Sequence, residues 1–171
     1  EMENAAAAAS LPELGKRRDL RTIPLVTIDG EDAKDFDDAV FAEPAPENCW
    51  RIIVAIADVS TYVQSGDILD NEARQRGNSV YLPGTVVPML PEALSNGLCS
   101  LRPHEDRACL AVEMIIDSAG NKQSHKFFQA LIRSSARLTY TLVQQVIEGS
   151  LNETDCKVTP GTLHHLIGAF R

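Results

Sequence analysis

Short runs of hydrophobic residues recur along this chain, and most are too short to form a buried helix. Leu25–Ile28 and Ala39–Glu43 each predict a strand, and Trp50–Ala57 predicts a central strand that is buried on both faces. Pro44–Asn48 has the composition of a turn and separates the second strand from the third. We therefore expect the first third of the chain to build part of a sheet.

Further along, the pattern predicts a hairpin. Cys109–Asp117 reads as a strand, Gln123–Arg133 reads as its partner, and Ser118–Asn121 supplies the turn. Asn78–Gly84 predicts a shorter extended piece that ends at its Pro-Gly pair.

Helical signals lie between and after these strands. The predicted helices are Ile68–Arg76 ending at Gly77, a proline-bounded helix at Pro88–Ser95, Tyr140–Gly149 capped by Thr139, and a last helix that starts at Thr159-Pro160 and runs to Arg171. Together the elements predict an α/β (α+β) fold with a mixed, largely antiparallel sheet and flanking helices. Residues 1–15, with the alanine tract Ala5–Ala9, predict a weakly ordered lead-in, either a marginal helix or a disordered segment.

Composition places the chain among ordinary globular proteins. Its 171 residues are 44% hydrophobic and 23% charged, which suits one domain or part of a larger one. The four cysteines form no C-x-x-C pair, so their spacing predicts neither a zinc knuckle nor a redox motif. The longest apolar run, Ile52–Ala57, is too short to span a bilayer, and no secretory signal is evident. We expect a cytoplasmic protein without membrane contact.

The net charge of −8 is concentrated in one stretch. Six acidic residues and one lysine lie between Asp29 and Asp38. Like charges at this density repel one another, by about 1–4 kcal/mol per close pair in a partly desolvated site. Carboxylate oxygens are the ligands that Mg²⁺ prefers, and two such ions can clamp the attacking and leaving oxygens of a phosphodiester. The sequence thus predicts either a metal site or a solvated acidic loop.

Three features favour the metal site. Predicted strands flank the stretch on both sides, so its carboxylates are tied to the core. Gly30 allows a sharp reversal after Asp29, and the apolar Phe36 indicates that one side of the loop packs inward. Two other acidic-site types fit poorly. A phosphohydrolase Asp-x-Asp at Asp35–Asp37 should follow a hydrophobic strand directly, and a calcium loop starting at Asp35 would lack its glycine.

Three further positions leave alternatives open. Asp58, at the end of the central strand, either joins the metal site or caps the following turn. The basic residues Lys16–Arg18 and Arg21 either meet a phosphate backbone or are solvated. Tyr81 is either an ordinary strand aromatic or a platform on which a base stacks, a contact worth about 1–3 kcal/mol.

Several motifs in a fixed order carry a family resemblance. These motifs are Leu25–Ala39, Val54–Ser60, Tyr81–Pro83, Pro88–Pro91 and Leu94–Leu101. From about Arg18 to about Gly149 the chain resembles the ribonuclease II/ribonuclease R (RNB) family. Within that family, Ile28–Ala33 and Leu94–Leu101 look most like the ribonuclease R branch. The resemblance implies that residues 16–171 are the N-terminal portion of an RNB catalytic domain, truncated at 171.

The resemblance also implies a function and a site. It implies a processive hydrolytic exoribonuclease that degrades single-stranded RNA from the 3′ end to nucleoside monophosphates, by a two-metal mechanism with Mg²⁺, for which Mn²⁺ is the expected substitute. The residues that match the family's active-site aspartates and metal ligands are Asp29, Asp35, Asp37 and Asp38. Tyr81 matches the tyrosine that positions the terminal nucleotide. We expect a monomer in the full-length form. The alternative is a non-catalytic RNA-binding or metal-binding fragment that keeps the RNB fold.

Overall fold

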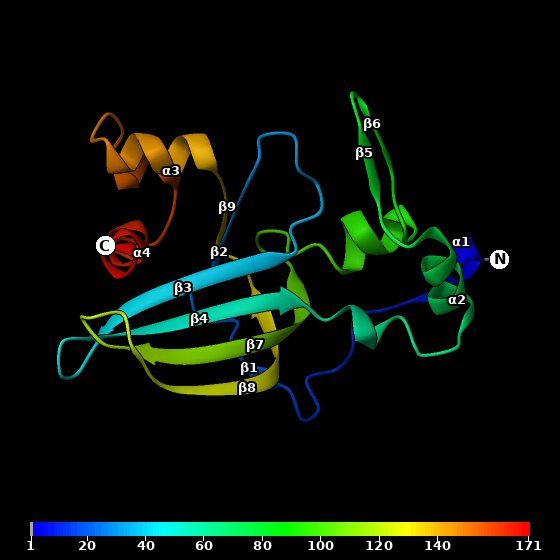
Figure 1. Ribbon diagram of the computed structural model, residues 1–171, viewed down its shortest axis with the longest axis horizontal. Coiled ribbons are helices and arrows are strands. Elements are labelled where there is room, and N and C mark those ends of the chain that lie inside the picture. The colour runs from blue at the N-terminus through cyan, green and yellow to red at the C-terminus, as the bar shows by residue number, and fades with distance from the viewer. Residues whose placement is uncertain (1) are drawn as a thin grey trace.

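A seven-stranded mixed sheet forms the centre of the computed structural model, which describes residues 2–171 (Figure 1). The strands lie in the order β1-β8-β7-β4-β3-β2-β9, with bounds β1 Arg18–Asp19, β2 Val26–Asp29, β3 Asp38–Ala45, β4 Cys49–Ala57, β7 Asp106–Ile116, β8 Lys122–Arg133 and β9 Ala136–Thr139. Only the outer pairs β1–β8 and β2–β9 are parallel. The predicted fold class, a largely antiparallel sheet with helices, is confirmed.

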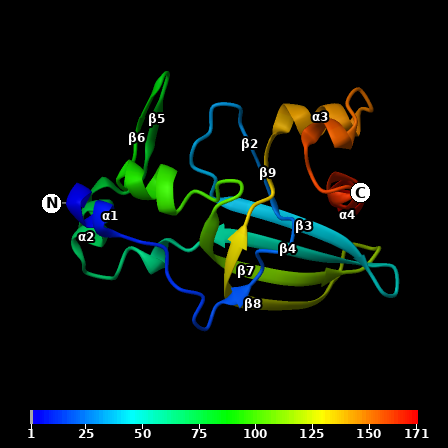
Figure 2. The same cartoon turned by 180° about the vertical axis from the view of Figure 1, so that it is seen from behind.

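The helices and a second, two-stranded sheet surround this core. Their bounds are α1 Met2–Ala8, η1 Val59–Thr61, α2 Ile68–Arg76, β5 Val80–Leu82, β6 Thr85–Val87, the π-helix η2 Ala93–Leu98, α3 Tyr140–Ile147, η3 Glu153–Cys156 and α4 Thr162–Phe170. Seen from both sides, α3 and α4 lie at one end of the molecule and α1 and α2 at the other (Figures 1 and 2). Between these ends the β2–β3 loop and the β5–β6 hairpin project in the same direction (Figures 1 and 2).

Local capping chemistry explains where two predicted helices begin. The Asp67 side chain accepts a hydrogen bond from the backbone N–H of Asp70 at the start of α2, and Gly77 ends that helix with φ 79°. At α3, Thr139 Oγ1 accepts from the N–H of Leu142 at 3.1 Å. Both predicted starts are confirmed.

The proline-bounded helices begin later than predicted. The predicted helix Pro88–Ser95 is wrong in its first half, because Pro91 has no N–H and its carbonyl instead accepts the N–H groups of Leu94 and Ser95. The π-helix therefore occupies Ala93–Leu98. The last helix is also displaced, since Gly161, with φ 88°, precedes its first residue.

Two extended segments differ from the prediction. Pro44 and Ala45, predicted as turn, still pair with Trp50 and Cys49, and the reversal is made by Glu47 and Asn48 in the left-handed region (φ 59° and 57°). The predicted extended piece around Tyr81 is one strand of a hairpin, because Leu82 pairs across a tight turn with Thr85.

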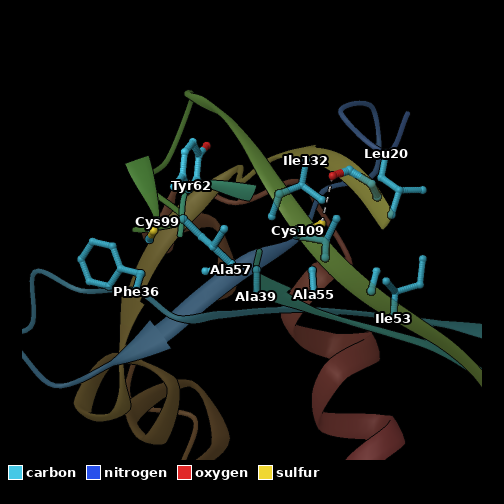
Figure 3. Close-up of a cluster of buried hydrophobic side chains, with 14 of the residues drawn as sticks. Leu20, Phe36, Ala39, Ile53, Ala55, Ala57, Tyr62, Cys99, Cys109 and Ile132 are labelled. Atoms are coloured by element: carbon cyan, nitrogen blue, oxygen red, sulfur yellow. Dashed lines mark hydrogen bonds between the residues drawn. The ribbon is translucent and has the colours of Figure 1, made fainter. Parts of the chain in front are cut away.

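The main hydrophobic core covers one face of β4. Ile53 and Ala55 are fully buried there with Cys109 and Ile132 (Figure 3). A fully buried residue such as Ile53 contributes about 1.5–3 kcal/mol of hydrophobic stabilisation. Burial of β4 on both faces was a wrong prediction, because Ile56 on the opposite face is 47% exposed. Antiparallel neighbours allow one face of a strand to meet solvent.

A second apolar cluster joins the C-terminal helices to the sheet. Val26 and Leu138, from the parallel strands β2 and β9, pack with Leu163 of α4 and Val143 of α3. This cluster fixes the end of the sheet from which the acidic loop leaves. At the other end of the chain, α1 is a helix whose Ala6 is buried in the main core.

Candidate functional site

The β2–β3 loop carries the four aspartates singled out from the sequence. Asp29 is the last residue of β2 and Asp38 is the first residue of β3, so both are held by the sheet. Asp29 pairs in register with Thr139 of β9, and Asp38 with Ile56 of β4. Asp35 and Asp37 lie on the irregular segment between the two strands.

The chain reverses direction directly after Asp29. Gly30 is not in the left-handed region, so the reversal does not use a conformation that favours glycine. Instead, Asp29 Oδ1 accepts the N–H of Gly30 at 2.7 Å, and the N–H of Ala33 donates to the carbonyl of Gly30 at 3.3 Å. The reversal is therefore made by a carboxylate–backbone contact followed by a turn.

Backbone hydrogen bonds fix the return of the loop to the sheet. The N–H of Leu101 donates to the carbonyl of Phe36 at 2.8 Å, and the N–H of Ala57 donates to the carbonyl of Asp37 at 2.9 Å. The Phe36 ring is 8% exposed and lies in the main core with Cys99 (Figure 3). This confirms that one side of the loop packs inward. Asp35 and Asp37, on either side of Phe36, remain open to solvent.

Two carboxylates of the loop, those of Asp37 and Asp38, are disfavoured in their charged form. Partial burial, and then the negative charges of Asp35, Asp38 and Asp29, raise the pKa of Asp37 above its usual 3.8. Partial burial and the charge of Asp29 likewise raise the pKa of Asp38. Although Asp37 and Asp38 reach solvent, the packed loop reduces their hydration. The site is thus a region of unbalanced negative charge.

Within the described part of the chain, no basic side chain forms an ion pair with these four carboxylates. None of the ion pairs among residues 2–171 includes Asp29, Asp35, Asp37 or Asp38. The donors are hard carboxylate oxygens, which is the ligand chemistry of Mg²⁺. By charge and by donor type, the four aspartates fit a divalent cation.

The carboxylates are not already gathered around one point. Among residues 2–171, no three His, Cys, Asp or Glu side chains are arranged to hold a metal ion. Within residues 2–171, two of the four carboxylate side chains accept hydrogen bonds, Asp29 from Gly30 and Asp35 from Tyr81. Metal ligation by the four aspartates stays a prediction.

Tyr81 reaches this loop from the β5–β6 hairpin. Its hydroxyl donates to Asp35 Oδ2 at 2.8 Å, although the two residues are 46 positions apart in the chain. The hydrogen bond to Asp35 is the main reason why the pKa of Tyr81 is raised. The side chain is 66% exposed, so one face of the ring is available to a ligand. A nucleotide-positioning role for Tyr81 is untested.

Asp58 belongs to a different network. It is 6% exposed, and Oδ2 accepts from Arg17 at 2.8 Å and from Thr61 at 2.9 Å, while Oδ1 accepts from Ser60 at 2.6 Å. Burial alone would raise its pKa, but hydrogen bonds from Ser60, Arg17 and Thr61 outweigh burial and lower it. Asp58 thus ties the N-terminal segment to the end of β4 and takes no part in the acidic loop.

Two arginines of the basic patch predicted near the N-terminus make internal ion pairs. Arg17 is largely buried against Asp58. Arg21 pairs with Asp19 and Asp106, at 2.7 and 3.1 Å. Arg17 and Arg21 therefore have a structural role. Lys16 and Arg18 are exposed, so for these two residues the phosphate-binding patch and the solvated patch both stay predictions.

Comparison with known proteins identifies the family. Residues 17–167 match the family model described as the RNB domain. The chain belongs to the RNB domain family. The RNB match covers every strand from β1 to β9 and all four candidate aspartates.

Relatives and solved structures agree with the RNB assignment. The chain is 58% identical over 141 residues to ribonuclease R of Vibrio parahaemolyticus, covering 81% of this chain and 17% of that protein. It is 54% identical over 151 residues to ribonuclease R of Escherichia coli, covering 87% and 19%. Mycoplasma genitalium RNase R, solved in complex with ribose-methylated single-stranded RNA, matches with a TM-score of 0.90 at 35% identity over 99% of this chain and 26% of that one. The chain thus spans about a fifth of the length of these two relatives.

None of the helices within residues 2–171 has the length and apolar character needed to cross a membrane.

Proposed function

We propose that this chain forms the metal-binding part of an exoribonuclease that hydrolyses single-stranded RNA from its 3′ end with Mg²⁺, releasing nucleoside monophosphates. One observation carries the proposal. Four aspartates share a single loop, partial burial and neighbouring carboxylates raise the pKa of Asp37 and Asp38, and the exposed Tyr81 reaches the same loop through Asp35. Its similarity to ribonuclease R proteins, one of them solved with single-stranded RNA, supports RNA as the substrate class.

Each aspartate has a distinct place in this proposal. Asp29 and Asp38, fixed by strands at the two ends of the loop, would be the most direct ligands. Asp35 would complete the coordination shell, and Asp37 would hold a second ion or orient the attacking water. When bound, Mg²⁺ would neutralise charge that develops on the phosphoryl oxygens during in-line displacement.

Tyr81 would bind and orient the end of the RNA. Its exposed ring can stack on the terminal base, and its hydroxyl bond to Asp35 keeps that ring beside the carboxylates. Holding the last nucleotide in one orientation places the scissile phosphate near the aspartates, and such positioning lowers the entropic part of the barrier. In its full-length form we expect this exoribonuclease to act as a cytoplasmic monomer.

A time course on 5′-labelled single-stranded RNA tests this proposal. The chain is incubated with Mg²⁺ or with EDTA, and Asp37→Asn is the matched variant because it removes charge without changing volume. We expect products that shorten progressively from the 3′ end, only with Mg²⁺ and only with Asp37. Equal shortening by Asp37→Asn, or in EDTA, would contradict the proposal.

A folded chain that does not shorten the RNA would favour the second candidate, an RNA-binding or metal-binding piece of an RNB domain. The chain spans about a fifth of the length of its ribonuclease R relatives, and in that outcome catalysis requires residues outside the aligned segment.

A further inference from the structure

Two side chains from distant parts of the chain hold the backbone of the acidic loop. We propose that Ser100 and Arg137 are positioning residues that set the loop aspartates for a divalent cation. This inference rests on the proposed function, because it assumes that the loop binds a cation. It adds two residues that carry no carboxylate and touch none of the four aspartate side chains through a hydrogen bond.

Ser100 holds the backbone on both sides of Asp35. Its hydroxyl donates to the carbonyl of Lys34 at 2.8 Å and accepts the N–H of Phe36 at 3.0 Å. Ser100 is completely buried, so neither backbone group could replace this bond with water without opening the core. A single hydroxyl therefore fixes the peptide groups that flank Asp35.

Ser100 is itself held in place. Its carbonyl accepts from Arg107 Nε at 2.8 Å, and Arg107 is 7% exposed. The next residue, Leu101, donates to the carbonyl of Phe36. The segment that carries Ser100 is thus a rigid support for the second half of the loop.

Arg137 holds the first half of the loop from β9. Its Nη2 donates to the carbonyl of Gly30 at 2.8 Å and also to the carbonyl of Glu31. The guanidinium carbon lies 5.5 Å from the centre of the Phe36 ring, a cation–π contact. Because β9 pairs in parallel with β2, Arg137 approaches the loop where the chain leaves the strand.

The acceptors of Arg137 indicate that this residue positions the loop rather than neutralises the charge of the loop. An arginine beside an acidic loop normally pairs with its carboxylates, and a bidentate pair is the strongest form of that contact. Arg137 instead bonds to two carbonyl oxygens and leaves the aspartates outside the ion pairs of residues 2–171. The carboxylates stay available to a cation while their backbone is fixed.

The two roles predict opposite effects on metal affinity. Arg137 carries a positive charge that repels a bound cation, so an arginine with only an electrostatic effect would weaken metal binding. Removing it would then increase affinity. If Arg137 positions the loop, removing it loosens the aspartates and decreases affinity. Outer residues that orient metal ligands typically change affinity by about 10–100-fold.

The direction of the change in metal affinity is measured by titrating the chain with Mn²⁺ while electron paramagnetic resonance reports the free ion. We expect Arg137→Gln to weaken Mn²⁺ affinity by about tenfold. Arg137→Lys, which keeps the charge and one donor, should lie between this variant and the parent chain. Arg133→Gln is the matched control, because the ion pair of Arg133 is with Asp106, which lies outside the loop. Its Mn²⁺ affinity should equal that of the parent.

Ser100→Ala provides an independent test from the other side of the loop. We expect a similar loss of Mn²⁺ affinity, measured below the melting temperature of each variant so that only folded protein is compared. Ser95→Ala is its control, since Ser95 is five residues earlier in the chain and its hydroxyl donates to the carbonyl of Pro91 rather than to the loop. A purely structural role would lower the melting temperature and leave Mn²⁺ affinity in the folded state unchanged.

The outcomes separate this inference from the proposed function. Unchanged or tighter Mn²⁺ binding by Arg137→Gln, or by Arg137→Lys if the first variant does not fold, overturns the role of Arg137. Unchanged binding by folded Ser100→Ala overturns that of Ser100. Failure of the parent chain to bind Mn²⁺ overturns the metal site of the proposed function and this inference with it.

Discussion

The hydroxyl of Tyr81 donates to Asp35 Oδ2 at 2.8 Å and joins the β5–β6 hairpin to the β2–β3 loop. Both segments project from the body of the molecule in the same direction (Figures 1 and 2). The hairpin otherwise has little support, since Val80, Tyr81 and Leu82 of β5 are all exposed. This contact therefore couples the candidate RNA platform to the candidate metal ligands.

Two substitutions of Tyr81 should distinguish the contribution of its ring to RNA binding from that of its hydroxyl. Tyr81→Phe keeps the stacking surface, so we expect little change in affinity for single-stranded RNA and a loss of stability of no more than about 1 kcal/mol. Tyr81→Ala removes the ring and should weaken RNA binding by about 1–3 kcal/mol. Fluorescence anisotropy with labelled RNA measures both. Equal affinity of Tyr81→Ala and the parent chain would argue against a stacking role.

Asp37→Asn should stabilise the fold slightly at neutral pH. Since the pKa of Asp37 is raised on folding, the folded state binds more protons than the unfolded state, and the free energy of unfolding falls as pH rises from 3.8 through the folded pKa. Asparagine removes this penalty. We expect a gain of less than about 1 kcal/mol above that window, because the carboxylate reaches solvent, and none below pH 3.8.

Thermal melts of the parent chain and of Asp37→Asn, from below pH 3.8 to neutral pH, measure this difference in stability. A large loss of stability in Asp37→Asn at neutral pH would instead make Asp37 a structural residue.

Mg²⁺ should raise the melting temperature of the chain. A cation that binds only the folded loop stabilises it by about 2.7 kcal/mol when present at 100 times its dissociation constant. Sodium chloride at equal ionic strength controls for general screening. Asp38→Asn removes a predicted direct ligand, so it should lose most of the Mg²⁺ effect. An equal shift in the parent and in Asp38→Asn would place the bound cation elsewhere.

Asp58→Asn should destabilise the fold without altering the acidic loop. It leaves the largely buried Arg17 without its carboxylate, and breaking a buried pair costs about 3–5 kcal/mol. Urea unfolding measures the change. Glu72→Gln, which removes the more exposed Arg76 pair, is the control and should cost less than about 1 kcal/mol. Similar losses in both variants would show that Asp58 has no special structural role.

The sequence was sufficient where the determinants are local. Alternating and continuous apolar runs predicted β2, β3, β4 and the β7–β8 hairpin, because side-chain period and turn residues lie within a few positions of one another. The position of Phe36 between two aspartates also predicted that the loop packs inward, since neighbouring residues in an extended segment face opposite sides.

The sequence was insufficient where contacts are long-range or made by the backbone. The short strands β1 and β9 are stabilised by parallel pairing with distant partners, and nothing in their few residues marks them as strands. Arg17 and Asp58 are 41 positions apart in the chain. The interpretations that the sequence left open for these two residues therefore did not include their ion pair. Arg137 donates to backbone carbonyl groups. Every residue has such a group, so the sequence does not show which of them an arginine binds. Ser100 was noted only within a motif.

The central claim is that the acidic loop binds a divalent cation through its aspartates, and this is measurable on the chain as it stands. Isothermal titration with Mn²⁺, followed by displacement with Mg²⁺, compares the parent with the variant Asp29→Asn/Asp38→Asn. We predict saturable Mn²⁺ binding that Mg²⁺ displaces and that the double variant loses while it stays folded. Equal Mn²⁺ binding by the parent and a folded double variant would contradict the account.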